Sequence, residues 1–173
     1  MITRRSAGIL AFSIWVSAAF AQSGKLNDPQ IAHIAYTAGV IDVAAARQAL
    51  SQSTNTDVRA FAENMVRDHE TVNKLALDLL QKLKVTPEDN DRSRSLSKSA
   101  AGELIELGKL KGAEFDKAYV SNEVAYHKAV DDALESTLIP GATNPELKSL
   151  LQTGLRIFQG HAQHAEHLAA SLK

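Results

Sequence analysis

Apolar residues recur at helical spacing along most of this chain, and single ionisable residues interrupt the pattern. In the stretch 57–84 the apolar positions share one side of a helix at about 100° per residue: Val58, Phe61, Ala62, Met65, Val72, Ala76, Leu79 and Leu83. His69 falls on that same side, and Asp68 falls at its margin. The pattern predicts a helix that packs its apolar face against other helices and turns a histidine inward.

The same spacing predicts four further helices. They cover residues 29–51, 95–110, 113–138 and 145–172. Two of them start with a capping residue followed by proline, which suits the first helical position because its missing N–H has no partner there: Asp28-Pro29 and Asn144-Pro145. No stretch alternates like a strand. The sequence therefore predicts an all-α protein, an antiparallel four-helix bundle with 95–110 as a short extra helix or kinked segment.

The first residues do not follow this pattern. Arg4 and Arg5 precede an apolar run over 7–20, and Ala19-Phe20-Ala21 is a small-x-small cleavage signal. These features predict a secretory signal peptide over 1–21 and a single mature domain over 22–173. The apolar run is shorter than the ~20 residues of a comfortable membrane span, and no later run is long enough either. An uncleaved membrane anchor is the alternative reading.

Composition excludes several classes of protein. The chain has no cysteine, which excludes disulfides, thiolate metal sites and a lipidated cysteine. Acidic and basic residues nearly balance, which argues against a nucleic-acid binder. Alanine-rich helix faces suit both tight packing within one chain and contact between subunits, so a homo-oligomer stays open.

The inward-facing polar residues are candidate metal ligands. His69, His127 and His161 come from three different predicted helices and would meet in one interior. Asp68 and Glu123 are the candidate carboxylate ligands, and Glu123 faces the same partner as His127, four residues later. Imidazole with carboxylate suits zinc, iron, copper or nickel. Asp42, at the border of its apolar stripe, could add a third carboxylate.

A second histidine cluster lies near the end of the chain. His161, His164 and His167 follow each other at intervals of three residues and therefore fan around their helix. His164 is thus a weaker candidate ligand. We expect His164 and His167 to lie on a solvated face, where cations suit the C-terminal end of the helix dipole.

Two other functions compete with metal binding. In the first, histidines and carboxylates only satisfy one another, in a structural or partner-binding bundle without a metal. In the second, the protein is a metal-dependent oxidase or handles peroxide, which needs an open coordination position. The sequence assigns no catalytic residue and favours a protein that is not an enzyme. Di-iron bundles need Glu-x-x-His pairs, and the chain contains none.

Several of these residues also resemble a known family. The motifs Met65-Val66-x-Asp68-His69 and Gly112-x-x-Phe115-Asp116-x-x-Tyr119, followed by His127 and a histidine in the last helix, resemble the bacterial domain-of-unknown-function 4142 family. Its members are exported and often labelled outer-membrane proteins.

The resemblance covers nearly all of the predicted mature chain, and it implies a ferritin-like helical bundle. For a helical chain without barrel strands we expect a periplasmic location, with peripheral outer-membrane association as the alternative. The family carries no established biochemical function.

Overall fold

The computed structural model describes residues 24–172 and is all-helical, with no strand in that range. In chain order its elements are α2 (Asp28–Gln52), α3 (Thr56–Leu83), α4 (Asp91–Gly108), α5 (Gly112–Ala133), the π-helical turn η1 (Leu134–Leu138), α6 (Ile139–Gly141) and α7 (Pro145–Ser171). The signal peptide predicted for 1–21 lies outside the described residues. Within 24–172, no helix combines the length and the apolar character that crossing a membrane requires.

Asparagine side chains cap the starts of α2, α3, α4 and α7. Each one accepts hydrogen bonds from backbone N–H groups of the first turn, an arrangement that stabilises a helix by about 1 kcal/mol. Asp28, which the sequence suggests as the α2 cap, has a different role, because Asn27 occupies the cap position. Asp28 instead accepts hydrogen bonds from the backbone N–H groups of Thr143 (2.8 Å) and Asn144 (2.9 Å), just before α7.

Two helices differ in extent from the sequence prediction. The helix expected over 95–110 begins at Asp91, because the Asn90 side chain caps it and the polar residues that follow lie in its first turns. The helix expected over 113–138 changes at Ala133 into the π-helical turn η1. That turn buries Leu134 and Leu138 on the same side.

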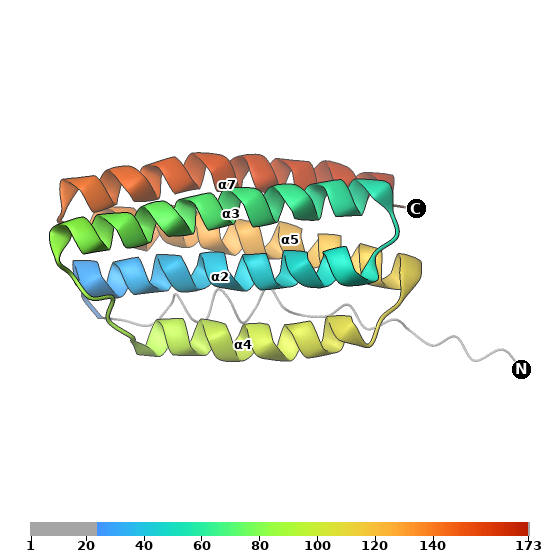
Figure 1. Cartoon of the computed structure of the whole chain (residues 1–173), viewed down its shortest axis with the longest axis horizontal. Coiled ribbons are helices and arrows are strands. Elements are labelled where there is room, and N and C mark those ends of the chain that lie inside the picture. Colours follow the sequence, from blue (N-terminus) through green and yellow to red (C-terminus); the bar gives the residue numbers. More distant parts are fainter. Residues whose placement is uncertain (1–23, 173) are drawn as a thin grey trace, which may run out of the picture.

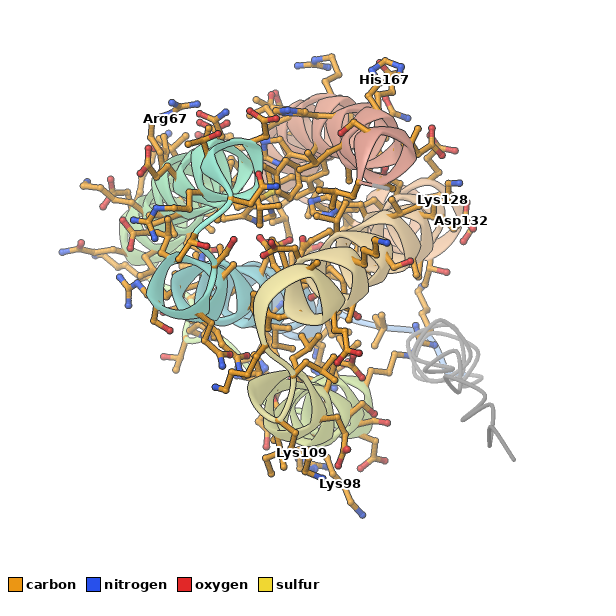
Figure 2. All side chains as sticks on the ribbon, turned by 90° about the vertical axis from the view of Figure 1, so that its right-hand side faces the viewer. Arg67, Lys98, Lys109, Lys128, Asp132 and His167 are labelled. Carbon is orange, nitrogen blue, oxygen red and sulfur yellow. The ribbon has the colours of Figure 1, made fainter. Side chains whose placement is uncertain are left out.

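Four long helices, α2, α3, α5 and α7, pack against one another and are called the core helices below. Helix α4 packs mainly against the outer side of α2 (Figures 1 and 2). Figure 1 shows that α2 and α3 run in opposite directions, as do α5 and α7. Helix α4 carries the chain back along the outside, so α5 runs in the same direction as α3.

The interior consists of two apolar cores with polar residues between them. The aromatic core includes Val58, Phe61, Met65, Leu107, Phe115, Tyr119 and Val120. The aliphatic core includes Ile31, Ile34, Leu134, Leu138, Leu147 and Leu151, with Tyr126 and Phe158 at its inner edge. Between them along the core helices lie five buried polar residues, called the polar layer below: Asp42, His69, Glu123, His127 and His161.

Candidate metal centre

Three histidines from three helices meet in the polar layer. His69 of α3, His127 of α5 and His161 of α7 are each at most 7% exposed. Their ring centroids lie 5.3, 5.5 and 5.6 Å apart, and one nitrogen from each ring lies within 4.8 Å of the others. The rings form a nearly regular triangle in the protein interior.

Each histidine continues the buried face of its helix. His69 follows the fully buried Met65 by four residues on α3, and His161 lies between Phe158 and Ala165 on α7. Residues three or four apart lie on the same side of a helix, one turn from each other. The helical repeat that builds the apolar cores therefore also turns the histidines inward.

Asp42 brings the fourth core helix, α2, into the group. Its side chain is fully buried, and its Oδ2 atom lies 3.2 Å from Nε2 of His69 and 3.3 Å from Nε2 of His127. From the sequence, Asp42 lies at the border of its stripe and is only a possible third carboxylate, after Asp68 and Glu123. The signal that identifies it is the helical repeat of buried α2 positions on either side: Ile34, Ala38, Ala45 and Ala49.

Asp68 supports the triangle from outside. Its Oδ2 atom lies 3.1 Å from Nε2 of His161, and Arg67 donates hydrogen bonds to both of its carboxylate oxygens. Burial acts to raise the pKa of Asp68, but the hydrogen bonds from Arg67 and His161 lower it overall. Asp68 is therefore an ionised carboxylate that accepts the Nε2–H of His161, a contact that orients metal-binding histidines.

This contact leaves the other ring nitrogen of His161 available. Its Nδ1 atom is buried, and no described residue forms a hydrogen bond with it. Because Nε2 holds the proton, Nδ1 of the neutral ring carries a lone pair.

The tautomer of His127 is fixed in a similar way. Its Nδ1 atom lies 3.0 Å from the backbone carbonyl oxygen of Glu123, and a carbonyl can only accept a hydrogen bond. Nδ1 therefore carries the proton, and Nε2 of the neutral ring carries a lone pair directed toward Asp42. Burial lowers the pKa of His127 to about 3, so the ring is neutral at neutral pH.

His69 and His161 are neutral for related reasons. Burial, followed by the charges that His127 and His161 would carry, lowers the pKa of His69 well below its ordinary value. Burial also lowers the pKa of His161, against the opposing effect of Asp68. All three imidazoles are thus in the neutral form that binds metal ions.

Glu123 and Asp42 place two carboxyl groups beside His127. Glu123 is 1% exposed, and one of its carboxylate oxygens lies 3.5 Å from Nδ1 of His127. Burial raises the pKa of Asp42 to about 8, and burial together with the neighbouring Asp42 raises that of Glu123 well above its usual range. Two buried carboxyls this close hold a proton between them when no cation neutralises their charge. Asp42, Glu123 and His127 also form a second group whose ligand atoms lie within 4.8 Å of one another.

The distances at Asp42 match those around a small metal ion. Ligand atoms at ~2.0–2.1 Å from a tetrahedral zinc ion lie ~3.3 Å from one another. The Asp42 oxygen lies 3.2 and 3.3 Å from the two histidine nitrogens. The Asp42 oxygen is therefore spaced from each of these two nitrogens as neighbouring corners of a tetrahedral site are. His161 belongs with His69 and His127 to the group of potential ligands formed by the three histidines.

Comparison with known proteins identifies the family. The family model described as a domain of unknown function, DUF4142, matches residues 16–168. The chain belongs to the DUF4142 family. No curated protein and no solved structure matches it.

The second motif that suggests DUF4142 lies away from the triangle. Phe115 and Tyr119 are fully buried in the aromatic core, where their rings stack at a centroid distance of 6.1 Å. Asp116 is buried beside them. Of the motif positions, only Asp68 and His69, together with His127 and His161, take part in the candidate site.

The remaining histidines of this DUF4142 chain lie outside the site. His164 and His167 are exposed, and Figure 2 shows His167 pointing away from the core on α7. His164 contacts the edge of Phe61 at a centroid distance of 5.1 Å. Neither residue belongs to the two groups of potential ligands found among the described residues. His33 is half-buried near Asp89.

Proposed function

We propose that this DUF4142 protein is an exported periplasmic protein that binds one transition-metal ion in its polar layer. His69, His127, His161 and Asp42 provide the ligand atoms, with Glu123 as a neighbouring carboxylate. Zinc, iron, copper and nickel are the ions that suit imidazole and carboxylate ligands. Asp68 orients His161 from outside the site, the arrangement usual for a histidine ligand.

One contact supports metal binding most strongly. Nε2 of His127 and Oδ2 of Asp42 face each other at 3.3 Å, and Nε2 presents a lone pair because Nδ1 holds the proton. A lone pair and a carboxylate oxygen repel unless a proton or a cation lies between them. The two neighbouring histidines add further nitrogen ligands, which favours a cation over a proton.

The arrangement of the helices supports a ferritin-like four-helix bundle. The core helices form two antiparallel pairs, and α4 is the long crossover between them (Figure 1). Ferritin-like folds have one such crossover connection and place metal ligands on facing helices. The missing Glu-x-x-His pairs argue for a single ion at the histidine triangle and against a di-iron centre.

The periplasmic location is supported by the sequence. Arg4 and Arg5, the apolar run over 7–20 and Ala19-Phe20-Ala21 have the order of a cleavable secretory signal. The metal ion would then be taken up by the mature protein after export. Metal binding would also stabilise the folded protein by mass action.

Metal analysis of tag-free protein tests the proposal. We expect about one tightly bound ion per chain after incubation with zinc and gel filtration. The double variant His69→Ala/His127→Ala should lose this ion, because it removes two of the nitrogen ligands. Thermal unfolding of the metal-free proteins checks that the variant folds.

The matched control removes the exposed histidines. His164→Ala/His167→Ala should keep the bound ion, since neither side chain reaches the polar layer. Equal metal content in all three proteins would show that the buried histidines bind no ion, and the proposal would then be wrong. Loss of metal only in the control variant would assign binding to the exposed cluster instead.

A further inference from the structure

A cavity lies next to the candidate metal site, on the side of the aliphatic core. Its volume is about 40 Å³, and its walls come from all four core helices and η1. A water molecule needs about 10–15 Å³ by the same measure, so the cavity has room for a molecule of a few heavy atoms. Its walls are almost entirely apolar, and polar groups are confined to few positions.

The polar end of the cavity is the metal site itself. Asp42, His69 and His127 all line it. The Phe158 ring also lines it and stacks on His69 with a centroid distance of 4.4 Å and an interplanar angle of 1°. A molecule in the cavity would therefore touch two metal-binding imidazoles and the carboxylate between them.

Small residues create the space. Alanine and glycine line the cavity at six positions: Ala32, Ala35, Ala38, Gly39, Ala76 and Gly154. A Cβ atom at Gly154 would lie 3.3 Å from the Phe158 ring and 3.8 Å from Val72. Larger side chains at these positions would fill the interior to the usual packing density.

The π-helical turn η1 forms another part of the wall. Leu134 and Leu138, at its two ends, both line the cavity. Such turns inside helices occur often at functional sites, since they change which side chains face inward. The wall includes two tyrosines, Tyr36 and Tyr126, and the Tyr126 hydroxyl already donates to the carbonyl oxygen of Ala38 at 2.8 Å.

We propose that this cavity is a binding chamber for a small uncharged apolar molecule, of the size of a diatomic gas, held beside the metal ion. A charged or strongly hydrogen-bonding ligand would lose its hydration against these walls and would find partners only at their few polar positions. An apolar ligand gives up no hydrogen bonds to water when it enters the cavity, and apolar protein cavities do bind xenon and benzene. The chamber itself does not require the metal, and only the contact with the ion rests on the function proposed above.

Xenon is the probe for this chamber. Xenon titration of metal-free protein, followed by NMR, should show saturable binding and should shift the imidazole signals of His69 and His127. The signals of the exposed His167 should stay unchanged. Binding without any shift of His69 and His127, or no saturable binding at all, would overturn the proposal.

Variants of matched size locate the bound xenon. Ala38→Leu adds bulk to the wall and should weaken xenon binding at least tenfold, whereas Val40→Leu, at an exposed position two residues later, should leave it unchanged. Leu151→Ala enlarges the cavity and should strengthen binding, which provides a second test if Ala38→Leu does not fold. Equal xenon affinity in Ala38→Leu, Leu151→Ala and the unchanged protein would overturn the chamber.

Metal analysis separates the two proposals. Xenon binding by a protein that retains no metal would support the binding chamber and contradict the proposed function. Retention of one ion without xenon binding would support the proposed function and contradict the binding chamber.

Discussion

The two apolar cores on either side of the polar layer are packed in different ways. In the aromatic core, Phe61, Phe115 and Tyr119 are fully buried, and their rings contact one another at centroid distances of 6.1 and 6.2 Å. In the aliphatic core, small residues such as Ala38 and Gly154 surround a cavity of about 40 Å³. Both cores include residues from all four core helices.

This difference separates two tasks of the interior. Large interlocking rings exclude space and contribute strongly to stability, whereas a cavity costs stability in proportion to its volume. The aromatic core therefore holds the helices in place while the aliphatic core keeps space beside the histidines. Substitutions at equivalent depths in the two cores should have unequal effects.

The largest effect is expected from Phe61→Ala in the aromatic core. Removing a fully buried ring leaves a void that the surrounding side chains only partly fill, so the free energy of unfolding should fall by about 3–5 kcal/mol. Urea unfolding measures the change. Metal affinity of the folded variant should stay the same, because Phe61 lies two turns from His69. A loss below 1 kcal/mol would show that the aromatic core is less tightly packed than described.

An intermediate effect on the free energy of unfolding is expected from valine substitutions, and it should differ between Ala62→Val and Ala38→Val. Ala62 is fully buried in the aromatic core, where two added methyl groups should cost about 1–3 kcal/mol by overpacking. Ala38 lines the cavity, and the same change should cost less than about 1 kcal/mol because the methyl groups enter free space. Thermal or urea unfolding of both variants gives the comparison. Equal losses would remove the proposed difference between the cores.

The smallest effect concerns the polar layer that divides the cores. Burial raises the pKa of Asp42 from 3.8 to about 8, so between these pH values the folded protein holds a proton that the unfolded chain does not. The raised pKa therefore favours the folded state at low pH. Its contribution to the free energy of unfolding is fully present below pH 4 and is lost as the pH rises toward 8. The buried histidines oppose this trend up to about pH 7.5, because they still bind protons in the unfolded chain. The contribution of Asp42 alone is a loss of up to about 1.4 kcal/mol per pH unit.

Asp42→Asn is the control for this pH dependence. The variant cannot ionise at position 42, so its free energy of unfolding should fall less between pH 6.5 and 8. Urea unfolding across that range, without metal, provides the measurement. Identical pH dependence in both proteins would show that Asp42 is already ionised in the folded state.

The helical repeat predicted the fold class and the inward-facing histidines. It gives the angular position of each side chain around its own helix, which was enough to select His69, His127 and His161. It does not give the rotation of one helix against the next or their relative heights. The convergence of the three rings therefore required the structure.

The same limit explains the roles of Asp42 and Asp68. Both lie at or near the margin of an apolar stripe, and the packing of neighbouring helices decides which one faces inward. In the structure, the Asp42 side chain points into the polar layer, where it contacts His69. Asp68 lies at the margin of the layer, contacts His161 and remains paired with Arg67. The π-helical turn also escaped prediction, because its apolar residues continue an ordinary helical repeat.

The carboxylate of Asp28 connects distant parts of the chain. It accepts hydrogen bonds from residues 115 and 116 positions later, at the entry to the last helix. Closing so long a segment costs chain entropy before contacts repay it, so we expect the last helix to dock late in folding. During synthesis, α2 and α3 would then keep one face uncovered until α7 has been made.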